Sequence, residues 1–170
     1  YAGPVGAYAE ERLVAAHRLV PLPDDVDEKT AAAAMLKGMT ARYLLRKTHP
    51  VAEGETILLH SAAGGVGLIA AQWARSLGAT VIGTVSTDEK AELARSAGCH
   101  HVVVTSREDL ARRVDEITGG AGVRVVYDSV GRDTFEDSLD CLAPLGLMVS
   151  FGNSSGPVPP FAPLLLSQKG

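Results

Sequence analysis

Short apolar runs recur along this chain and are separated by longer segments of mixed character. The runs are rich in Val, Ile, Leu and Thr, and they predict strands at residues 56–60, 80–85, 101–105, 123–127 and 147–151. Apolar strands that alternate with helical segments suit a parallel sheet covered on both faces. The pattern therefore predicts an α/β fold with a doubly wound parallel sheet in the order 3-2-1-4-5.

Helical segments are expected between these strands and before the first one. Asp27 is expected to cap a helix that Gly38 interrupts, with a second helix over residues 40–46 that ends before Pro50. Asp88 is expected to cap the helix after the second strand. The later helices are predicted at residues 68–77, 88–97, 107–117 and 132–142.

The two ends of the chain differ from this repeating pattern. Residues 1–26 are interpreted as the tail of a preceding domain and a linker, and a frayed arm is the alternative. Residues 27–170 are expected to form the domain that contains the sheet. The chain starts at Tyr1 rather than Met, and no sixth strand is evident before Gly170. We therefore expect a piece of a longer protein that lacks the sixth strand of its sheet.

The turn after the first predicted strand is rich in small residues. It reads Ser-Ala-Ala-Gly-Gly-Val-Gly, and Ala62, Gly64 and Gly67 fall on the three positions of a G-x-G-x-x-G pattern. In a strand–turn–helix context, small residues let the backbone approach a pyrophosphate at the helix N-terminus. The turn therefore predicts that residues 27–170 form a dinucleotide-binding Rossmann domain, and an ordinary tight turn in another α/β protein is the alternative.

The end of the second predicted strand bears on the choice of dinucleotide. An NAD site places a carboxylate there to bind the ribose hydroxyls, and this chain has no carboxylate before Asp88. Ser86 can donate a hydrogen bond to a 2′-phosphate, and Lys90 can pair with it. We therefore predict NADPH rather than NADH, the alternative being that Lys90 is only a solvated surface lysine.

Composition and charge exclude several classes of function. The net charge is −4 and the pI is about 5.7, which disfavours nucleic acid and anionic membranes as partners. No apolar run approaches the ~20 residues of a membrane span. Cys99 and Cys141 form no C-x-x-C motif, and the five histidines form no H-x-x-x-H motif, so no metal site is expected. A reducing cytoplasm is the expected compartment.

Two polar residues at predicted strand ends are candidates for catalysis. Asp128 follows the fourth strand, and we interpret it as an acceptor for backbone amides of the turn. His60 closes the first strand, and we interpret it as a group that fixes the turn, with catalysis as the alternative. No second group is evidently placed to make an acid–base pair, so the catalytic residues stay unknown.

Several runs together resemble the zinc-free quinone oxidoreductases of the medium-chain dehydrogenase/reductase superfamily. The matching runs are residues 36–41, 43–48, 60–67, 125–131 and 150–156. The resemblance implies a cofactor domain beside a GroES-like catalytic domain, without the cysteine lobe that binds zinc in alcohol dehydrogenases. It also implies a homodimer, formed through the strand that is missing here.

The resemblance also implies positions for the parts of NADPH. The pyrophosphate belongs at Gly64, Gly65, Val66 and Gly67. The 2′-phosphate belongs at Ser86 and Lys90, beside Thr105, where the family often has Tyr. Ser129 and Val130 match the adenine and ribose side, whereas Thr40, Phe151 and Gly152 match positions near the nicotinamide.

The function implied is transfer of a hydride, or of a single electron, from NADPH to a quinone. An enoyl or alkenal reductase of the same superfamily is the alternative enzyme. A non-catalytic NADPH-binding module is a second alternative. A methyltransferase is disfavoured, because it needs an acidic residue at the end of the second strand.

Overall fold

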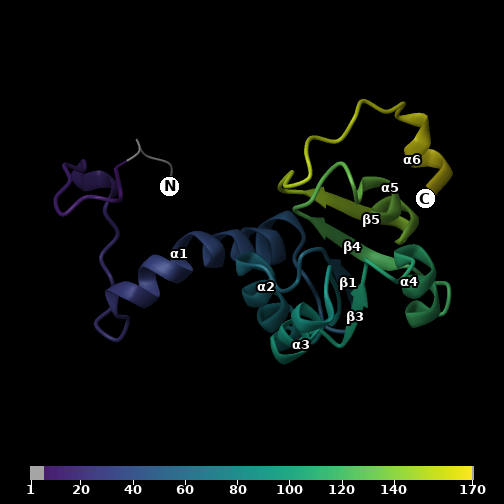
Figure 1. Ribbon diagram of the computed structural model, residues 1–170, viewed down its shortest axis with the longest axis horizontal. Helices are drawn as coiled ribbons and strands as arrows, with labels where there is room; N and C mark the ends of the chain where they lie inside the picture. The colour runs from purple at the N-terminus through teal and green to yellow at the C-terminus, as the bar shows by residue number, and fades with distance from the viewer. Residues whose placement is uncertain (1–5, 170) are drawn as a thin grey trace.

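The computed structural model describes residues 6–169 and contains one parallel sheet (Figure 1). Its five strands are β1 (Thr56–Leu59), β2 (Thr80–Val85), β3 (His101–Val104), β4 (Val123–Asp128) and β5 (Leu142–Ser150). They lie in the order β3-β2-β1-β4-β5, and each neighbouring pair is parallel. The predicted doubly wound order is confirmed, and residues 6–169 contain no sixth strand.

Helices cover both faces of this sheet. They are α1 (Glu28–Tyr43), α2 (Gly65–Ser76), α3 (Asp88–Ser96), α4 (Leu110–Thr118), α5 (Phe135–Asp140) and α6 (Leu164–Lys169). Side chains of α1, α2 and α3 pack with Ile57 and Leu59 on one face, whereas α4 packs with Leu58 on the other. Successive strand residues point to opposite faces, and because both faces are covered, every position of β1 and β2 after the first is buried.

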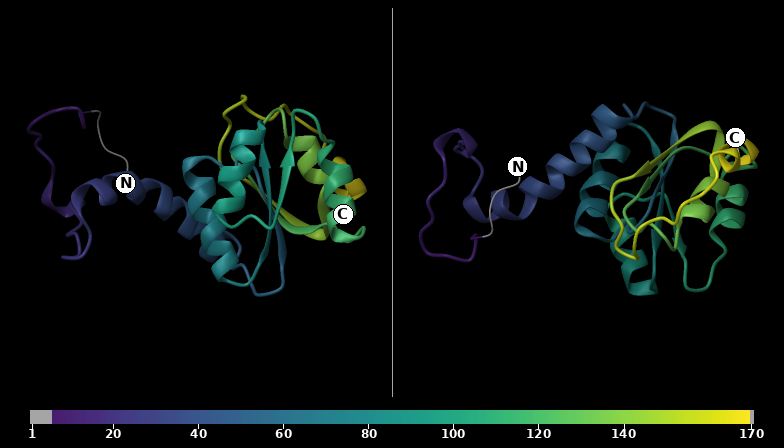
Figure 2. Two further views of the ribbon diagram at one scale, coloured as in Figure 1. Left: turned by 60° about the horizontal axis from the view of Figure 1, so that its bottom comes forward. Right: turned by 90° about the horizontal axis from the view of Figure 1, so that it is seen from above.

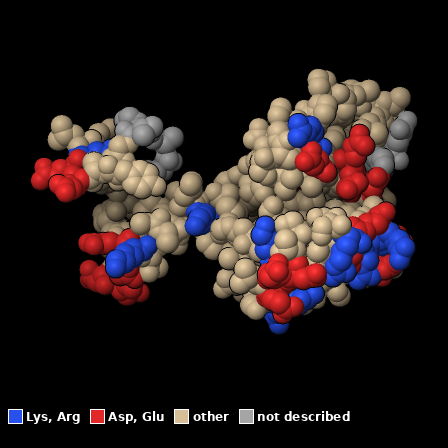
Figure 3. All heavy atoms as spheres, in the orientation of Figure 1, with Lys and Arg blue, Asp and Glu red and all other residues tan. Residues whose placement is uncertain are grey.

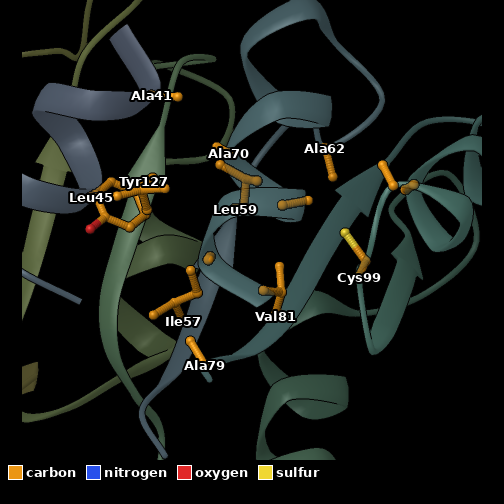
Figure 4. Close-up of a cluster of buried hydrophobic side chains, with 14 of the residues drawn as sticks. Ala41, Leu45, Ile57, Leu59, Ala62, Ala70, Ala79, Val81, Cys99 and Tyr127 are labelled. Carbon is orange, nitrogen blue, oxygen red and sulfur yellow. The ribbon is translucent and has the colours of Figure 1, made fainter. Parts of the chain in front are cut away.

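The larger core lies between the sheet and α1–α3. Ala70, Ala71 and Ala74 are buried on α2, and their small side chains let this helix lie close to the strands. Figure 4 shows Ala70 in the same cluster as Leu59 of β1. The buried hydroxyl of Tyr127 donates to the carbonyl oxygen of Leu44 at 3.2 Å. This bond from β4 ties the end of the first helical segment to the sheet.

The first helical segment corrects one prediction. Asp27 caps α1 as expected, with its side chain accepting from the amides of Lys29 and Thr30. Gly38 does not interrupt the helix, because α1 runs unbroken to Tyr43 and continues as a π-helical turn, Leu44–Thr48. One glycine costs a helix about 1 kcal/mol, which buried packing of the following residues outweighs.

Other element boundaries also differ from the predicted ones. Thr87 rather than Asp88 caps α3, and its hydroxyl accepts from the amide of Lys90 at 3.3 Å. Helices α4 and α5 begin three residues later than expected, at Leu110 and Phe135. Strand β5 begins at Leu142, where a helix end was expected, and its register with β4 shifts before Leu147. Pairing with a neighbouring strand therefore overrides local helical preference there.

The N-terminal part of the chain lies away from the sheet. Residues 6–27 contain only a short 3₁₀ turn, Ala16–Arg18, and α1 projects from the body to reach them (Figures 1 and 2). Residues 1–5 of the expected tail lie outside the described residues. A domain boundary after residue 26 stays a prediction.

Candidate functional site

A cavity of about 590 Å³ opens at the carboxyl ends of the strands. Its walls come from the ends of β1, β2 and β3, from the loop after β4, and from the start of α5. The residues from the predicted cofactor set that line it are Gly64, Ser86, Lys90, Thr105 and Val130. This is the end of a doubly wound sheet at which ligands bind.

The glycine turn forms the first turn of α2 and its cap. Gly64 is the N-cap residue, and no side chain caps this helix. A Cβ on Gly67 would lie 2.4 Å from the carbonyl oxygen of Ser61. Only glycine permits that approach, so Gly67 lets the first turn of α2 lie close to the backbone that leaves β1. The helix begins at Gly65, three residues earlier than expected, which places Gly65, Val66 and Gly67 in its first turn.

Lys37 on α1 reaches this turn. A Cβ on Gly65 would lie 2.6 Å from Cε and 3.2 Å from Nζ of Lys37, so the absence of a side chain at Gly65 makes room for the lysine. The ammonium adds positive charge to the positive end of the α2 dipole. Lys37 lies in one of the runs that carry the family resemblance, but no pattern of spacing connects it with Gly65.

Three of the predicted residues meet where β2 and β3 end. The ammonium of Lys90 donates to the hydroxyl of Ser86 at 3.1 Å. The hydroxyl of Thr105 donates to the carbonyl oxygen of Val85 at 3.2 Å. The grouping of Ser86, Lys90 and Thr105 at the cavity wall follows from adjacent parallel strands ending at one edge.

The remaining predicted residues do not line the cavity. Ser129 and Gly152 meet at the ends of β4 and β5, where a Cβ on Gly152 would lie 2.9 Å from the carbonyl oxygen of Ser129. Phe151 packs against the larger core, and its amide donates to the carbonyl oxygen of Asp128 at 2.8 Å. Thr40 lies apart on α1 and donates to the carbonyl oxygen of Leu36 in its own helix at 2.8 Å.

Asp128 is fully buried and accepts three hydrogen bonds. One carboxylate oxygen accepts from the amides of Val130 at 2.6 Å and Gly131 at 3.2 Å. The other accepts from the hydroxyl of Thr134 at 2.8 Å. These bonds agree with the interpretation of Asp128 as a group that holds the turn after β4.

His60 is buried with both ring nitrogens hydrogen-bonded. Its Nδ1 lies 3.0 Å from the Thr84 hydroxyl, and its Nε2 lies 2.9 Å from the Ser138 hydroxyl. The Ser138 hydroxyl donates to the carbonyl oxygen of Thr134 at 2.6 Å, so it accepts from Nε2–H. Nδ1 of neutral His60 then accepts from Thr84. Burial lowers the pKa of His60, and the charges of Asp128 and Asp137 partly oppose that shift.

Sequence reasoning missed one wall of the cavity. Asp133, Thr134 and Asp137 line it from the start of α5. In the predicted helix over residues 132–142, Asp133 and Asp137 would share one side because they are four positions apart. In the structure, Asp133 lies in the turn before α5 and Asp137 lies within the helix. The cavity is therefore lined by two acidic residues as well as by His60, and this grouping was not expected.

Residues 6–169 contain neither a candidate metal site nor a helix that could span a membrane. No group of three or more His, Cys, Asp or Glu side chains in that range is arranged to hold a metal ion. Across the same residues, every helix is too short or too polar to cross a bilayer. Both cysteines are buried and unpaired.

Comparisons with known proteins place this geometry in a family. The sequence model described as zinc-binding dehydrogenase matches residues 65–169. Over 168 residues, the chain is 58% identical to a quinone oxidoreductase from Pseudomonas aeruginosa, covering 99% of this chain and 52% of that protein. It is 56% identical to a 2-haloacrylate reductase from a Burkholderia species, covering 92% of this chain and 48% of that protein.

A solved structure shows the same similarity to quinone oxidoreductases. The Escherichia coli quinone oxidoreductase complexed with NADPH matches with a TM-score of 0.87 and 58% identity, covering 89% of this chain and 46% of that one. The chain thus spans about half the length of the curated relatives it matches. These matches confirm the resemblance to quinone oxidoreductases, and the chain belongs to the zinc-binding dehydrogenase family.

Proposed function

We propose that this chain supplies the NADPH-binding half of a quinone oxidoreductase. The observation that carries the proposal is the contact between Lys90 and Ser86 at the cavity wall, 3.1 Å long, beside a helix N-terminus with no side-chain cap. A cation and a hydroxyl at the end of β2 suit a 2′-phosphate. The relative from Escherichia coli, itself crystallised with NADPH, supports this choice of cofactor.

The residues present fit a dinucleotide. No side chain caps the N-terminus of α2, so the amides of its first turn can bind a phosphate, and Lys37 adds a cation there. We assign the pyrophosphate to residues 64–67, the 2′-phosphate to Ser86 and Lys90 beside Thr105, and the adenosine to Ser129 and Val130. The residues assigned to the nicotinamide side are Thr40, Phe151 and Gly152.

When bound, NADPH supplies a hydride, or a single electron, to the quinone. The part of this chain is to bind and orient the dinucleotide and to keep water from its reactive end. A quinone oxygen needs no strong protein acid once it is reduced, so no catalytic residue is assigned within this chain. His60 and Asp128 hold the surrounding turns rather than exchange protons with substrate.

Reduction of an activated alkene is a second candidate function. The relative named 2-haloacrylate reductase is 56% identical to this chain, nearly as similar as the quinone oxidoreductase from Pseudomonas aeruginosa. Both reactions use the same cofactor domain and differ in the acceptor. An assay of NADPH oxidation with a benzoquinone and with a 2-haloacrylate identifies the acceptor. Turnover of the 2-haloacrylate alone would favour the second function.

The arrangement of the whole protein is part of the proposal. We assign residues 1–26 to the tail of a GroES-like catalytic domain, which the projection of residues 6–27 from the body supports (Figure 2). We propose a zinc-independent homodimer joined beside β5, the strand at the edge of the sheet, where Leu145 is 85% exposed. The buried, unpaired cysteines support a cytoplasmic location.

Nucleic acid and membranes are not among the proposed partners. On the face shown in Figure 3, positive and negative side chains are mixed over α3 and α4. The net charge of −4 supports the same view, because phosphate backbones and anionic lipids attract basic surfaces.

A calorimetric titration with NADPH and NADH tests the cofactor. We expect micromolar binding of NADPH and at least tenfold weaker binding of NADH, a difference of about 1.4 kcal/mol. Lys90→Ala should weaken NADPH binding about tenfold and leave NADH nearly unchanged. Lys29→Ala, an exposed lysine at the start of α1, is the matched control. Equal affinity for the two dinucleotides, or none for either, would contradict the proposal.

A further inference from the structure

An ion pair joins the segments that leave β2 and β3. A guanidinium nitrogen of Arg107 lies 2.9 Å from a carboxylate oxygen of Asp88. Asp88 comes two residues after Ser86, and Arg107 comes two residues after Thr105. The pair therefore adjoins the cavity wall assigned to the 2′-phosphate, although neither residue lines the cavity itself. Both side chains remain exposed, at 57% for Arg107 and 74% for Asp88.

The balance of charge in the first turn of α3 is negative without this arginine. Residues 88–90 are Asp, Glu and Lys, which place two carboxylates against one ammonium. A carboxylate beyond the end of the second strand favours the free ribose hydroxyls of NADH and repels a 2′-phosphate. Some other cation must offset Asp88 if the site prefers NADPH.

The neutral groups of this wall do not supply that charge. The Thr105 hydroxyl donates to the carbonyl oxygen of Val85, and the Ser86 hydroxyl accepts from Lys90. Glu108, which is 3.6 Å from Arg107, is itself 3.2 Å from Arg113 and accepts from the amide of Val104. Arg107 is thus the cation paired with Asp88.

We propose that Arg107 sets the dinucleotide preference by neutralising Asp88, which leaves Lys90 as the net positive charge at the position assigned to the 2′-phosphate. The inference rests on the proposed function and extends it from one cation to a charge arrangement across two strand ends. Asp88 is then a residue that lowers the affinity for NADPH, and its effect is masked by the arginine. Removal of the Asp88 charge should therefore restore the NADPH affinity that Arg107→Ala loses.

The test compares four forms of the chain by titration with NADPH and NADH at low ionic strength. They are the wild type, Arg107→Ala, Asp88→Asn and the double variant. Because both charges of the pair are exposed and screened by solvent, Arg107→Ala should weaken NADPH binding by only about three- to fivefold. NADH binding should change by less than about twofold, and the double variant should bind NADPH nearly as the wild type does. Added salt should shrink these differences.

Arg112→Ala is the matched control. Arg112 is an exposed arginine on α4, paired with Glu116 at 3.0 Å, so its loss changes the net charge equally but away from the cavity. If Arg107→Ala lowers the ratio of NADPH to NADH affinity no more than Arg112→Ala does, the inference is wrong. The wild-type preference for NADPH and its dependence on Lys90 would then still stand. A wild type that binds no NADPH overturns the proposed function and this inference together.

Discussion

The Nε2 atom of His60 lies 2.9 Å from the hydroxyl oxygen of Ser138, 78 positions later in the chain. This bond joins the end of β1 to α5 beside the candidate dinucleotide cavity. The same ring accepts from Thr84 on β2, so one neutral imidazole connects three elements. A buried hydrogen-bonded ring of this kind holds a site in shape, and its protonation should weaken the fold.

The first prediction concerns pH. Burial holds the pKa of His60 below the ordinary value of 6.5, so the unfolded chain binds a proton more readily than the folded one. Stability should therefore fall as the pH drops through 6.5, and it should be insensitive to this group above that value. Urea unfolding between about pH 7.5 and 5.5 measures the slope, which should be shallower in His60→Asn.

The control for this measurement is His17→Asn, a change at an exposed histidine on the N-terminal segment. Only differences in slope matter, because His60→Asn also loses buried contacts. Equal slopes in the wild type and His60→Asn would show that His60 does not couple protonation to folding.

The second prediction contrasts two glycines. A Cβ on Gly67 would meet the backbone of Ser61 and Ala62, whereas a Cβ on Gly38 would meet nothing within 4 Å. Gly67→Ala should therefore lower the free energy of unfolding by about 1–3 kcal/mol or more. Gly38→Ala should raise it by about 0.5–1 kcal/mol, because alanine favours the helix. Thermal unfolding checks both, and a stabilising Gly67→Ala would contradict the close packing.

The third prediction concerns the turn after β4. Asp128→Ala leaves the amides of Val130 and Gly131 without their acceptor and should cost about 3 kcal/mol. Asp128→Asn keeps one acceptor oxygen for those amides and should cost clearly less. Denaturant unfolding of the two variants provides the comparison. A loss that is equal in both would mean that the charge, and not the acceptor geometry, holds this turn.

The fourth prediction concerns thiol reactivity. Burial raises the pKa of Cys99 to about 11 and is the main cause that raises the pKa of Cys141 to about 12. Because the thiolate is the reactive form, neither thiol should react with a chromogenic disulfide in the folded chain at about pH 8. Both should react once the chain is unfolded in urea. Rapid modification of the native protein at either position would contradict their burial.

Much of the candidate site was predictable because it depends on local chemistry. Ala62, Gly64 and Gly67 are spaced as a phosphate turn requires, and that turn lies where the structure forms the N-terminus of α2. Ser86 and Lys90 are four residues apart across a strand–helix junction, so their contact follows from the local geometry.

Other features depended on neighbours distant in the sequence. Glycine disfavours a helix, yet α1 continues past Gly38 because residues that follow it are buried against the sheet. Thr87 and Asp88 are both good caps, and the choice between them depends on where β2 ends and α3 begins. Leu142 pairs with Val123 and so belongs to β5 rather than to a helix.

By itself the sequence determined the order of the strands, the position of the phosphate turn and the groups at the end of β2. These follow from hydrophobic runs and from the short-range conformational preferences of glycine, serine and lysine. Only the tertiary structure decided three contacts: Lys37 packs over Gly65, His60 is hydrogen-bonded to Ser138, and Arg107 forms an ion pair with Asp88. Such contacts join residues far apart in the chain, and packing of whole elements, rather than local preference, brings them together.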